Sequence, residues 1–143
     1  MKKSLRLDDQ LCFSIYAAAH AFTRFYRPLL EPLGLTYPQY LVLLALWEED
    51  RLPVKAIGER LLLDSGTLTP LIKRMEEADL VTRLRDSADE RRVIVSLTTK
   101  GRRLRNAAEA FPAQIGAAAG CSASELSALR RTLTGLRDAL DAA

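Results

Sequence analysis

Two short helical patterns followed directly by a pair of alternating segments constrain the fold of this chain more than any other feature of its sequence. Residues 54–62 have the apolar spacing of a helix, and a turn rich in capping residues at 63–67 leads into a second helical pattern. Residues 80–85 and 92–97 then alternate between apolar and polar side chains, and the segment between them, 86–91, is charged. Such a pair is typical of a β-hairpin with a polar tip. We therefore expect a mainly α-helical chain with a small β-wing.

The N-terminal third of the sequence predicts two longer helices. Asp8 or Asp9 is expected to cap the first, whose apolar residues recur at steps of three and four and which Pro32 ends. Thr36 begins a T-x-x-Q spacing, that of a capping box, and opens an almost wholly apolar helix that runs through Trp47. A helix that is apolar all round belongs in the centre of the core.

The C-terminal third also predicts two helices. Thr98 or Thr99 caps the first, which is bent or interrupted near Pro112, and the S-x-x-E spacing of residues 122–125 is a capping box for the second. The leucines of the second helix fall at spacings of three and four: Leu126, Leu129, Leu133, Leu136 and Leu140. This narrow seam is typical of a helix that packs against another chain, and burial within the same subunit is the alternative.

Length and composition exclude several classes of protein. A chain of 143 residues with 48% hydrophobic content can bury the core of one domain. Its longest apolar stretch, Tyr40–Trp47, is far shorter than the roughly 20 residues of a membrane span, and residues 1–4 lead into charges, so we expect a cytoplasmic protein. There, Cys12 and Cys121 are not expected to form a standing disulfide, and with the isolated His20 they are too few for a metal site. Redox chemistry or simple packing remains for the two thiols.

Positive charge is concentrated in one part of the chain. The formal net charge is only +3, but residues 73–105 contain ten basic side chains against six acidic ones. A surface of that kind suits a polyanion.

The second helix of the helix-turn-helix pair has the side chains that a DNA-reading helix needs. Such a helix enters the major groove by its N-terminal end, where small polar residues reach base edges and phosphates. Ser65, Thr67 and Thr69 provide hydroxyls there, and Pro70 is expected to stiffen the first turn. Lys73 and Arg74 follow one turn later as candidate phosphate contacts. Helix capping and ordinary surface charge are the alternatives for these side chains.

The tip of the hairpin adds a second candidate contact. Arg91 is placed to enter a narrow minor groove, where negative potential is concentrated, and Asp89 could hold that arginine extended. A solvated surface pair is the alternative. Helix, turn, helix and charged hairpin in this order predict a winged helix-turn-helix lobe at residues 36–99 that binds double-stranded DNA. Residues 8–35 and 100–143 are then expected to be dimerisation helices of a single domain, residues 1–143.

The sequence resembles a known family at these motifs. Residues 64–71 with Lys73-Arg74, followed by Asp89-Glu90-Arg91-Arg92, are similar to the MarR family of winged-helix repressors. Residues 11–13 (Leu-Cys-Phe) and 35–40 (Leu-Thr-Tyr-Pro-Gln-Tyr) resemble its organic-hydroperoxide-sensing branch, the OhrR type. The likeness covers about residues 8–105 and is looser beyond them.

The resemblance implies a sensing cysteine shared between subunits. Cys12 and Tyr26 are fourteen residues apart, roughly 21 Å along one helix, so they cannot touch within a subunit, but helices running antiparallel in a dimer would bring them together. In the OhrR branch two tyrosines of the opposite subunit hydrogen-bond the cysteine, and these correspond to Tyr26 and Tyr37. Tyr16, four residues after Cys12, should line the same pocket.

The expected chemistry is attack of the Cys12 thiolate on a peroxide. Tyrosine hydroxyls that donate to the sulfur stabilise the thiolate, whereas Asp8 and Asp9 oppose it. Apolar side chains nearby, Phe13, Phe22, Phe25 and several leucines, favour organic hydroperoxides over hydrogen peroxide. Cys121 lies where the two-cysteine members of the branch have their resolving thiol, and packing is the alternative for it.

The sequence therefore predicts a homodimeric repressor without a cofactor, released from a pseudo-palindromic operator when Cys12 is oxidised. Two alternatives stay open. One is a MarR-type repressor released by a non-covalent phenolic ligand in the dimer cleft. The other is a thiol peroxidase, which is disfavoured because the sequence has no peroxidase-like cysteine motif and the DNA-reading elements would have no purpose.

Overall fold

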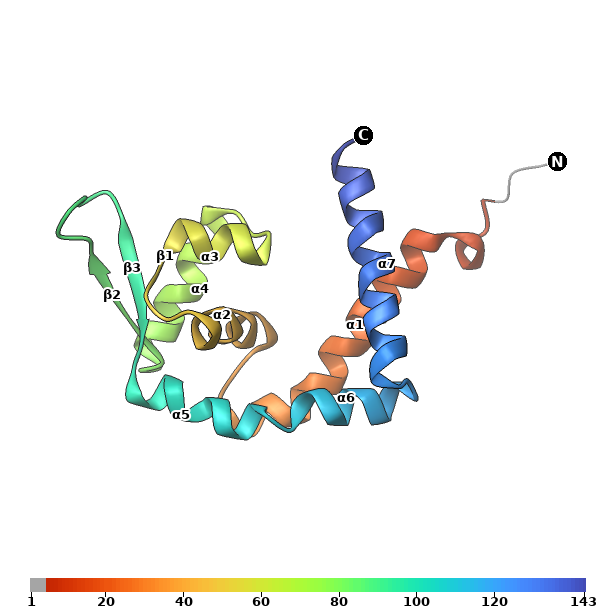
Figure 1. Ribbon diagram of the computed structural model, residues 1–143, viewed down its shortest axis with the longest axis horizontal. Coiled ribbons are helices and arrows are strands. Elements are labelled where there is room, and N and C mark those ends of the chain that lie inside the picture. Colours follow the sequence, from red (N-terminus) through yellow and green to blue (C-terminus); the bar gives the residue numbers. More distant parts are fainter. Residues whose placement is uncertain (1–4) are drawn as a thin grey trace. The chain divides into compact units, whose positions relative to one another are not determined.

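The computed structural model describes residues 5–143, so the expectation for residues 1–4 lies outside it. The chain forms two compact units, which divide after Arg105. The first unit contains the expected lobe of residues 36–99 together with the long N-terminal helix. Its small sheet and surrounding helices confirm the expected mainly helical, winged fold (Figure 1). The assignment of the remaining helices to a dimer interface stays a prediction.

The elements follow one another in the expected order. The first unit holds η1 (Leu7–Asp9), α1 (Leu11–Leu30), η2 (Glu31–Leu33), α2 (Tyr37–Glu48), β1 (Leu52–Pro53), α3 (Val54–Leu61), α4 (Ser65–Glu77), β2 (Val81–Arg85) and β3 (Val93–Leu97). The dividing point lies within α5 (Thr99–Ala108), and α6 (Phe111–Ala119) and α7 (Ala123–Asp141) complete the second unit.

The start of α1 corrects one expectation. Asp8 and Asp9 lie in η1, and the residue before α1 is Gln10, whose side chain makes no capping bond. The expected aspartate cap is therefore wrong. The reason is a single 3-10 turn, closed by the backbone N–H of Gln10 donating to the carbonyl of Leu7, which takes up both aspartates before the helix begins. At its other end α1 stops at Leu30, and the 3-10 turn that follows contains Pro32, as expected.

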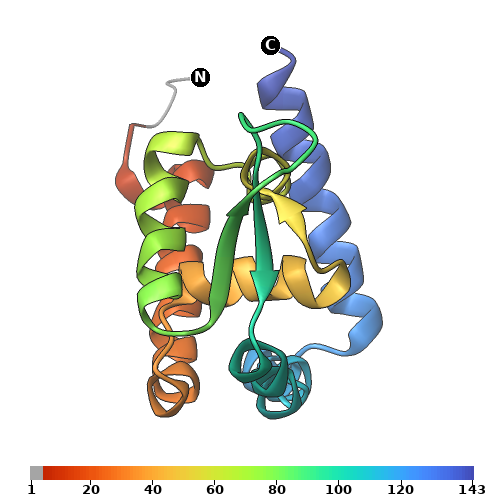
Figure 2. The same ribbon diagram turned by 90° about the vertical axis from the view of Figure 1, so that its left-hand side faces the viewer.

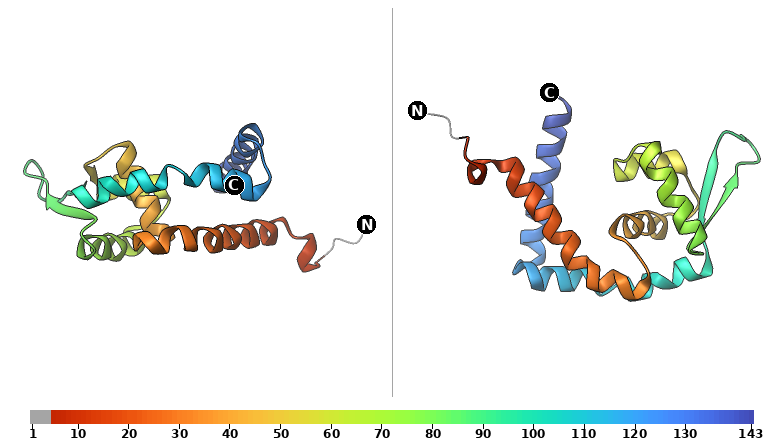
Figure 3. Two further views of the ribbon diagram at one scale, coloured as in Figure 1. Left: turned by 90° about the horizontal axis from the view of Figure 1, so that it is seen from below. Right: turned by 180° about the vertical axis from the view of Figure 1, so that it is seen from behind.

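Helix α2 is the centre of the first unit. The backbone N–H of Gln39 donates to the Thr36 hydroxyl at 3.4 Å, and the Thr36 N–H donates to the Gln39 side chain at 3.1 Å, so the capping box is confirmed. Six residues of this helix are buried: Gln39, Tyr40, Val42, Leu43, Ala45 and Leu46. Figure 2 shows α2 (orange) crossing behind the sheet, while α1 leads away from the lobe in Figure 3.

The sheet has three antiparallel strands in the order β1-β3-β2. Arg83 pairs with Val95 in the hairpin, and Leu52 of β1 pairs with the same Val95 from the other side. The sequence predicts the hairpin and an extended piece near Leu52. It does not predict that this piece pairs with β3, because a strand of two residues has no pattern that identifies its partner. Asp50 fixes that arrangement, because its carboxylate accepts from the backbone N–H of Leu97 at 2.9 Å.

The second unit begins at Asn106, within the last turn of α5, and the interruption before Pro112 is confirmed. Ser122 and Glu125 form the predicted capping box of α7. Along α7 the seam leucines Leu129, Leu133 and Leu140 are exposed. No single helix within residues 5–143 is long and apolar enough to cross a membrane; the stretch Leu11–Leu33 and α2 meet that test only as a pair bent by 73°.

Candidate functional sites

The N-terminus of α4 is organised by Asp64. Its carboxylate accepts from the backbone N–H of Thr67 at 2.7 Å, and this bond, followed by one from the Thr67 hydroxyl, lowers the pKa of Asp64. The cap is therefore Asp64 rather than Ser65 or Thr67. Because the helix begins at Ser65, Pro70 lies in its second turn, which corrects the expectation that it stiffens the first.

The predicted DNA-contacting residues of α4 all lie on its exposed side. Leu68, Leu71, Ile72 and Met75 are the buried face of the helix. The other side carries the predicted contacts: Ser65, Thr67, Thr69, Lys73 and Arg74. Among the described residues, the hydroxyls of Ser65 and Thr69 make no hydrogen bond, so both are available to a ligand.

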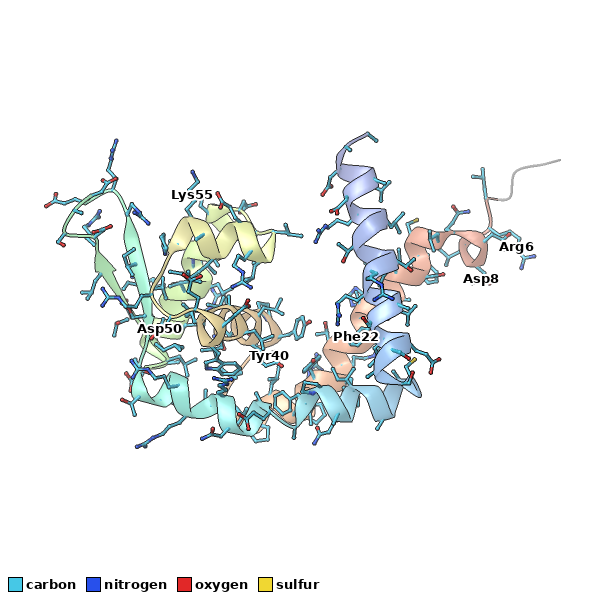
Figure 4. All side chains as sticks on the ribbon, in the orientation of Figure 1. Arg6, Asp8, Phe22, Tyr40, Asp50 and Lys55 are labelled. Carbon is cyan, nitrogen blue, oxygen red and sulfur yellow. The ribbon has the colours of Figure 1, made fainter. Side chains whose placement is uncertain are left out.

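A concavity of about 690 Å³ lies between α3, α4 and the hairpin. It brings together Thr69 and Arg91, two residues that the sequence singles out separately. Its wall also includes Arg83 and Arg92 of the basic stretch, and Lys55, which the sequence analysis did not single out. Figure 4 shows Lys55 on the outer side of α3. Only the folded lobe places these cations around one surface, since Lys55 lies outside the basic stretch of the sequence.

The hairpin tip is held by its own side chains. Arg91 Nε donates to the Asp89 carboxylate at 3.2 Å, and the backbone N–H of Arg91 donates to the same oxygen at 3.1 Å. The Arg91 side chain nevertheless remains 92% exposed. The arrangement fits the expectation that Asp89 holds Arg91 extended, although what Arg91 contacts stays a prediction.

Glu76 ties the recognition helix to the hairpin. Its carboxylate accepts from the guanidinium of Arg83 at 3.1 and 3.3 Å and from the Arg83 backbone N–H at 3.2 Å. These bonds lower the pKa of Glu76, and the hydrogen bond from the Arg83 guanidinium contributes most. The orientation of the hairpin relative to α4 therefore depends on an ion pair between neighbouring elements.

Cys12 lies in the first turn of α1 as an exposed free thiol. Tyr16 is one turn later and is also exposed; its ring is 4.4 Å from that of His20. The chain thus places Tyr16 on the same end of α1 as Cys12. It does not bring Tyr16 to Tyr26, which lies in the last third of α1, or to Tyr37, which begins α2.

Tyr26 and Tyr37, the two tyrosines that the resemblance assigns to the cysteine pocket, are adjacent within the chain. Their ring centroids are 5.0 Å apart, and a third tyrosine that the sequence analysis did not single out, Tyr40, lies 5.4 Å from Tyr26. Burial raises the pKa of all three phenols, and their mutual repulsion adds to this rise at Tyr26. They are therefore neutral hydrogen-bond donors at physiological pH. Figure 4 labels Asp8, which lies in η1 just before α1, and Tyr40, which lies in α2.

Cys121 lies between two helix caps in the second unit. Gly120, with φ of 66°, ends α6, and Ser122 caps α7. The Cys121 thiol is half-buried and 3.5 Å from the carbonyl oxygen of Ala119. Within residues 5–143 no three His, Cys, Asp or Glu side chains form a group able to hold a metal ion.

Comparison with known proteins decides the family. Residues 24–108 match the family described as transcriptional regulator SarA/Rot. The chain belongs to this family of winged-helix transcriptional regulators. It is also 56% identical to the HTH-type transcriptional regulator TtmR of Methylorubrum extorquens over 95% of the chain and 70% of that protein. It is 47% identical to the organic hydroperoxide resistance transcriptional regulator of Bacillus subtilis, over 95% of the chain and 92% of that protein. The resemblance to the MarR-type fold and its hydroperoxide branch is thus confirmed.

Solved structures of a related regulator agree with the fold. Reduced AbfR bound to DNA matches 96% of this chain and 94% of its own with a TM-score of 0.76 and 37% identity. A disulfide-formed structure of AbfR matches with a TM-score of 0.66 and 40% identity, over 92% of this chain and 93% of its own. A third structure identifies AbfR as a protein of Staphylococcus epidermidis. Family and relatives alike are transcriptional regulators.

Proposed function

We propose that this regulator is a homodimeric DNA-binding repressor that organic hydroperoxides inactivate by oxidising Cys12. One observation carries the proposal: the adjacent neutral phenols of Tyr26 and Tyr37 lie at one end of α1 and the exposed thiol of Cys12 at the other. Two copies of α1 running antiparallel would bring each thiol to the tyrosines of its partner. Supporting it are the relative in Bacillus subtilis, named for organic hydroperoxide resistance, and the reduced, DNA-bound state of AbfR.

The DNA-binding part of the proposal places α4 in the major groove. The exposed hydroxyls of Ser65 and Thr69 would face base edges, Lys73 and Arg74 would contact phosphates, and Arg91 would enter the flanking minor groove. In a dimer the two recognition helices must match major grooves about 34 Å apart, so the operator is expected to be pseudo-palindromic.

The redox part proceeds in two balanced steps. The thiolate sulfur of Cys12 attacks the terminal oxygen of the hydroperoxide; an S–O bond forms, the O–O bond breaks, and the alkoxide leaves as an alcohol after taking a proton from water. The product is a sulfenic acid. The Cys121 thiol then attacks that sulfur, an S–S bond forms, and the sulfenic oxygen leaves as water.

The disulfide connects chemistry to DNA release through geometry. Its two Cα atoms must lie within about 7 Å, so a longer separation in the reduced dimer requires the helices that carry Cys12 and Cys121 to move. Movement of those helices would change the separation of the two recognition helices. A change of a few ångströms there is enough to lose the match to the two grooves.

The test compares wild type with Cys12→Ser on a DNA duplex selected from a random pool by the reduced protein. Both should bind this duplex with about equal affinity, because serine retains the size and polarity of the side chain. Cumene hydroperoxide should release only the wild type, since serine lacks the nucleophile. Release of the Cys12→Ser variant by the peroxide would reject Cys12 as the trigger. Retention of wild type on DNA after peroxide, with release by a phenolic compound, would instead favour a non-covalent ligand.

A further inference from the structure

Tyr40 shares a hydrogen bond with one of the two proposed sensor tyrosines. The hydroxyls of Tyr26 and Tyr40 share a hydrogen bond within the same chain, in which either oxygen can be the donor. A phenol has one proton to donate and two lone pairs that accept. Tyr26 therefore cannot donate to Tyr40 and to a cysteine sulfur at the same time. When Tyr26 donates to Cys12, its bond with Tyr40 can persist only with Tyr40 as the donor.

The packing around Tyr40 lets its hydroxyl donate to Tyr26 without movement of the ring. Tyr40 is only 4% exposed, and its ring lies 5.4 Å from that of Tyr26 and 6.2 Å from that of Trp47. Trp47 is itself fixed, because its indole N–H donates to the carbonyl of Gly101 at 2.9 Å. A ring held on two sides stays in place, whereas a hydroxyl proton rotates freely about its C–O bond.

We propose that Tyr40 is a positioning residue for the sensor, and that its hydroxyl donates to Tyr26 whenever Tyr26 donates to the Cys12 thiolate of the partner subunit. This inference rests on the proposed function. A donor that itself accepts a hydrogen bond becomes more polarised, so the chain Tyr40 to Tyr26 to sulfur stabilises negative charge better than Tyr26 alone.

Replacing Tyr40 by phenylalanine would leave the other polar groups of the proposed pocket in place. The carboxylates closest to Cys12 in sequence, Asp8 and Asp9, lie in η1, and Tyr16 packs on His20. Tyr37 contacts Tyr26 directly and keeps its own hydroxyl in a Tyr40→Phe variant. A change in thiolate reactivity after this substitution therefore reports the contact between the two hydroxyls.

The test measures how fast iodoacetamide alkylates Cys12 at neutral pH in the reduced, full-length Cys121→Ser protein, together with thiolate absorbance. Tyr26→Phe should slow alkylation roughly ten-fold or more, the loss of one hydrogen bond to a charged group. Tyr40→Phe should slow it roughly two- to four-fold, which is the effect of weakening that bond without removing it. The double variant should react at the rate of Tyr26→Phe, because Tyr40 acts only through Tyr26.

Trp47→Phe is the matched control. It disturbs the packing beside Tyr40 and removes the bond to Gly101, but it removes no hydroxyl from the cluster, so it should lower the melting temperature and leave the alkylation rate unchanged. The parent of this series is the Cys121→Ser protein. The proposal is overturned if Tyr40→Phe is alkylated as fast as the parent, or if Tyr40→Phe slows alkylation further in the Tyr26→Phe background. It is also overturned if Trp47→Phe slows alkylation as much as Tyr40→Phe does. Failure of the proposed function is distinguishable, because it would appear as a parent protein that cumene hydroperoxide does not oxidise, while the alkylation series still decides the role of Tyr40.

Discussion

At the N-terminus of α4, one carboxylate determines which hydroxyls remain for the proposed contacts with DNA. Asp64 takes the capping position and engages both the backbone N–H and the hydroxyl of Thr67. Ser65 and Thr69 remain exposed without a bond inside the described chain. Because Asp64 caps the helix, the hydroxyls of Ser65 and Thr69 are not needed for capping and can bind a ligand. The sequence alone could not assign the cap, since Asp64, Ser65 and Thr67 are all residue types that favour it.

Lys73→Ala tests the placement of α4 at the phosphate backbone. Lys73 is exposed one turn beyond the hydroxyls and would neutralise one phosphate per subunit. Its loss should weaken binding to all DNA sequences alike and reduce the slope of log K against log salt by about 0.9 for each contact removed. Fluorescence anisotropy on specific and random duplexes at several salt concentrations measures both quantities. An unchanged slope would mean that Lys73 faces away from the DNA.

At the scale of elements, the junction between α2, α5 and the sheet links the tyrosine cluster to the wing. The indole N–H of Trp47 in α2 donates to the carbonyl of Gly101, which lies in the first turn of α5. The hydroxyl of Thr98, which caps α5, donates to the carbonyl of Leu80 at the start of the hairpin at 3.1 Å. Asp50 holds the end of β3 from the other side. A displacement of α5 is therefore transmitted to both α2 and the wing.

Gly101→Ala tests this junction. A Cβ on Gly101 would overlap the carbonyl oxygen of Leu80, so α5 has to move away from the hairpin. The substitution should destabilise the fold by about 1–3 kcal/mol, the usual cost of overpacking. Gly135→Ala is the matched control, because a Cβ there meets no atom within 4 Å, and it should be neutral or stabilising by up to about 1 kcal/mol. Urea unfolding of both variants measures the difference, and equal stability of the two would contradict the tight junction.

The sequence predicts most elements here but not their junctions. Local signals such as the Thr36 capping box and the alternation of the hairpin involve residues close in sequence, so they can be recognised from the sequence alone. The pairing of β1 with β3, the bond from Trp47 to Gly101 and the approach of Tyr40 to Tyr26 join residues far apart in sequence. No spacing rule reports such contacts. The aspartate cap of α1 failed because a 3-10 turn competes locally for the same residues.

Glu76→Gln tests the ion pair between α4 and β2 through its pH dependence. The pKa of Glu76 is lowered in the folded protein, so its carboxylate contributes stability that is present above its unfolded pKa of about 4.3 and is lost as the pH falls through the lower folded pKa. Wild type should therefore exceed Glu76→Gln in stability at pH 6–7, and the gap should close towards pH 3. Thermal unfolding across this range measures it. A gap that does not vary with pH would show that charge plays no part in the contact.

At the scale of the whole molecule, the two cysteines belong to different compact units, Cys12 to the first and Cys121 to the second. The exposed leucine seam of α7 supports a role for the second unit in holding two chains together. Local signals identify each thiol and each helix. No pattern within one chain predicts whether Cys12 pairs with Cys121 of the same chain or of the partner chain. That pairing is a property of the assembly and has to be measured on it.

Cys121→Ser separates sensing from disulfide formation. Oxidation of Cys12 should still occur in this variant, but the sulfenic acid should persist or pass to higher acids, because no second thiol is present to displace its oxygen. Since we expect Cys12 of one chain to pair with Cys121 of the other, wild type treated with cumene hydroperoxide should run as a covalent dimer on a non-reducing gel and return to monomer with dithiothreitol. Cys121→Ser should remain monomeric on the same gel. A peroxide-dependent disulfide confined to monomers would reject the intersubunit pairing, and the absence of any disulfide in wild type would assign Cys121 to packing and leave Cys12 as the sole redox residue.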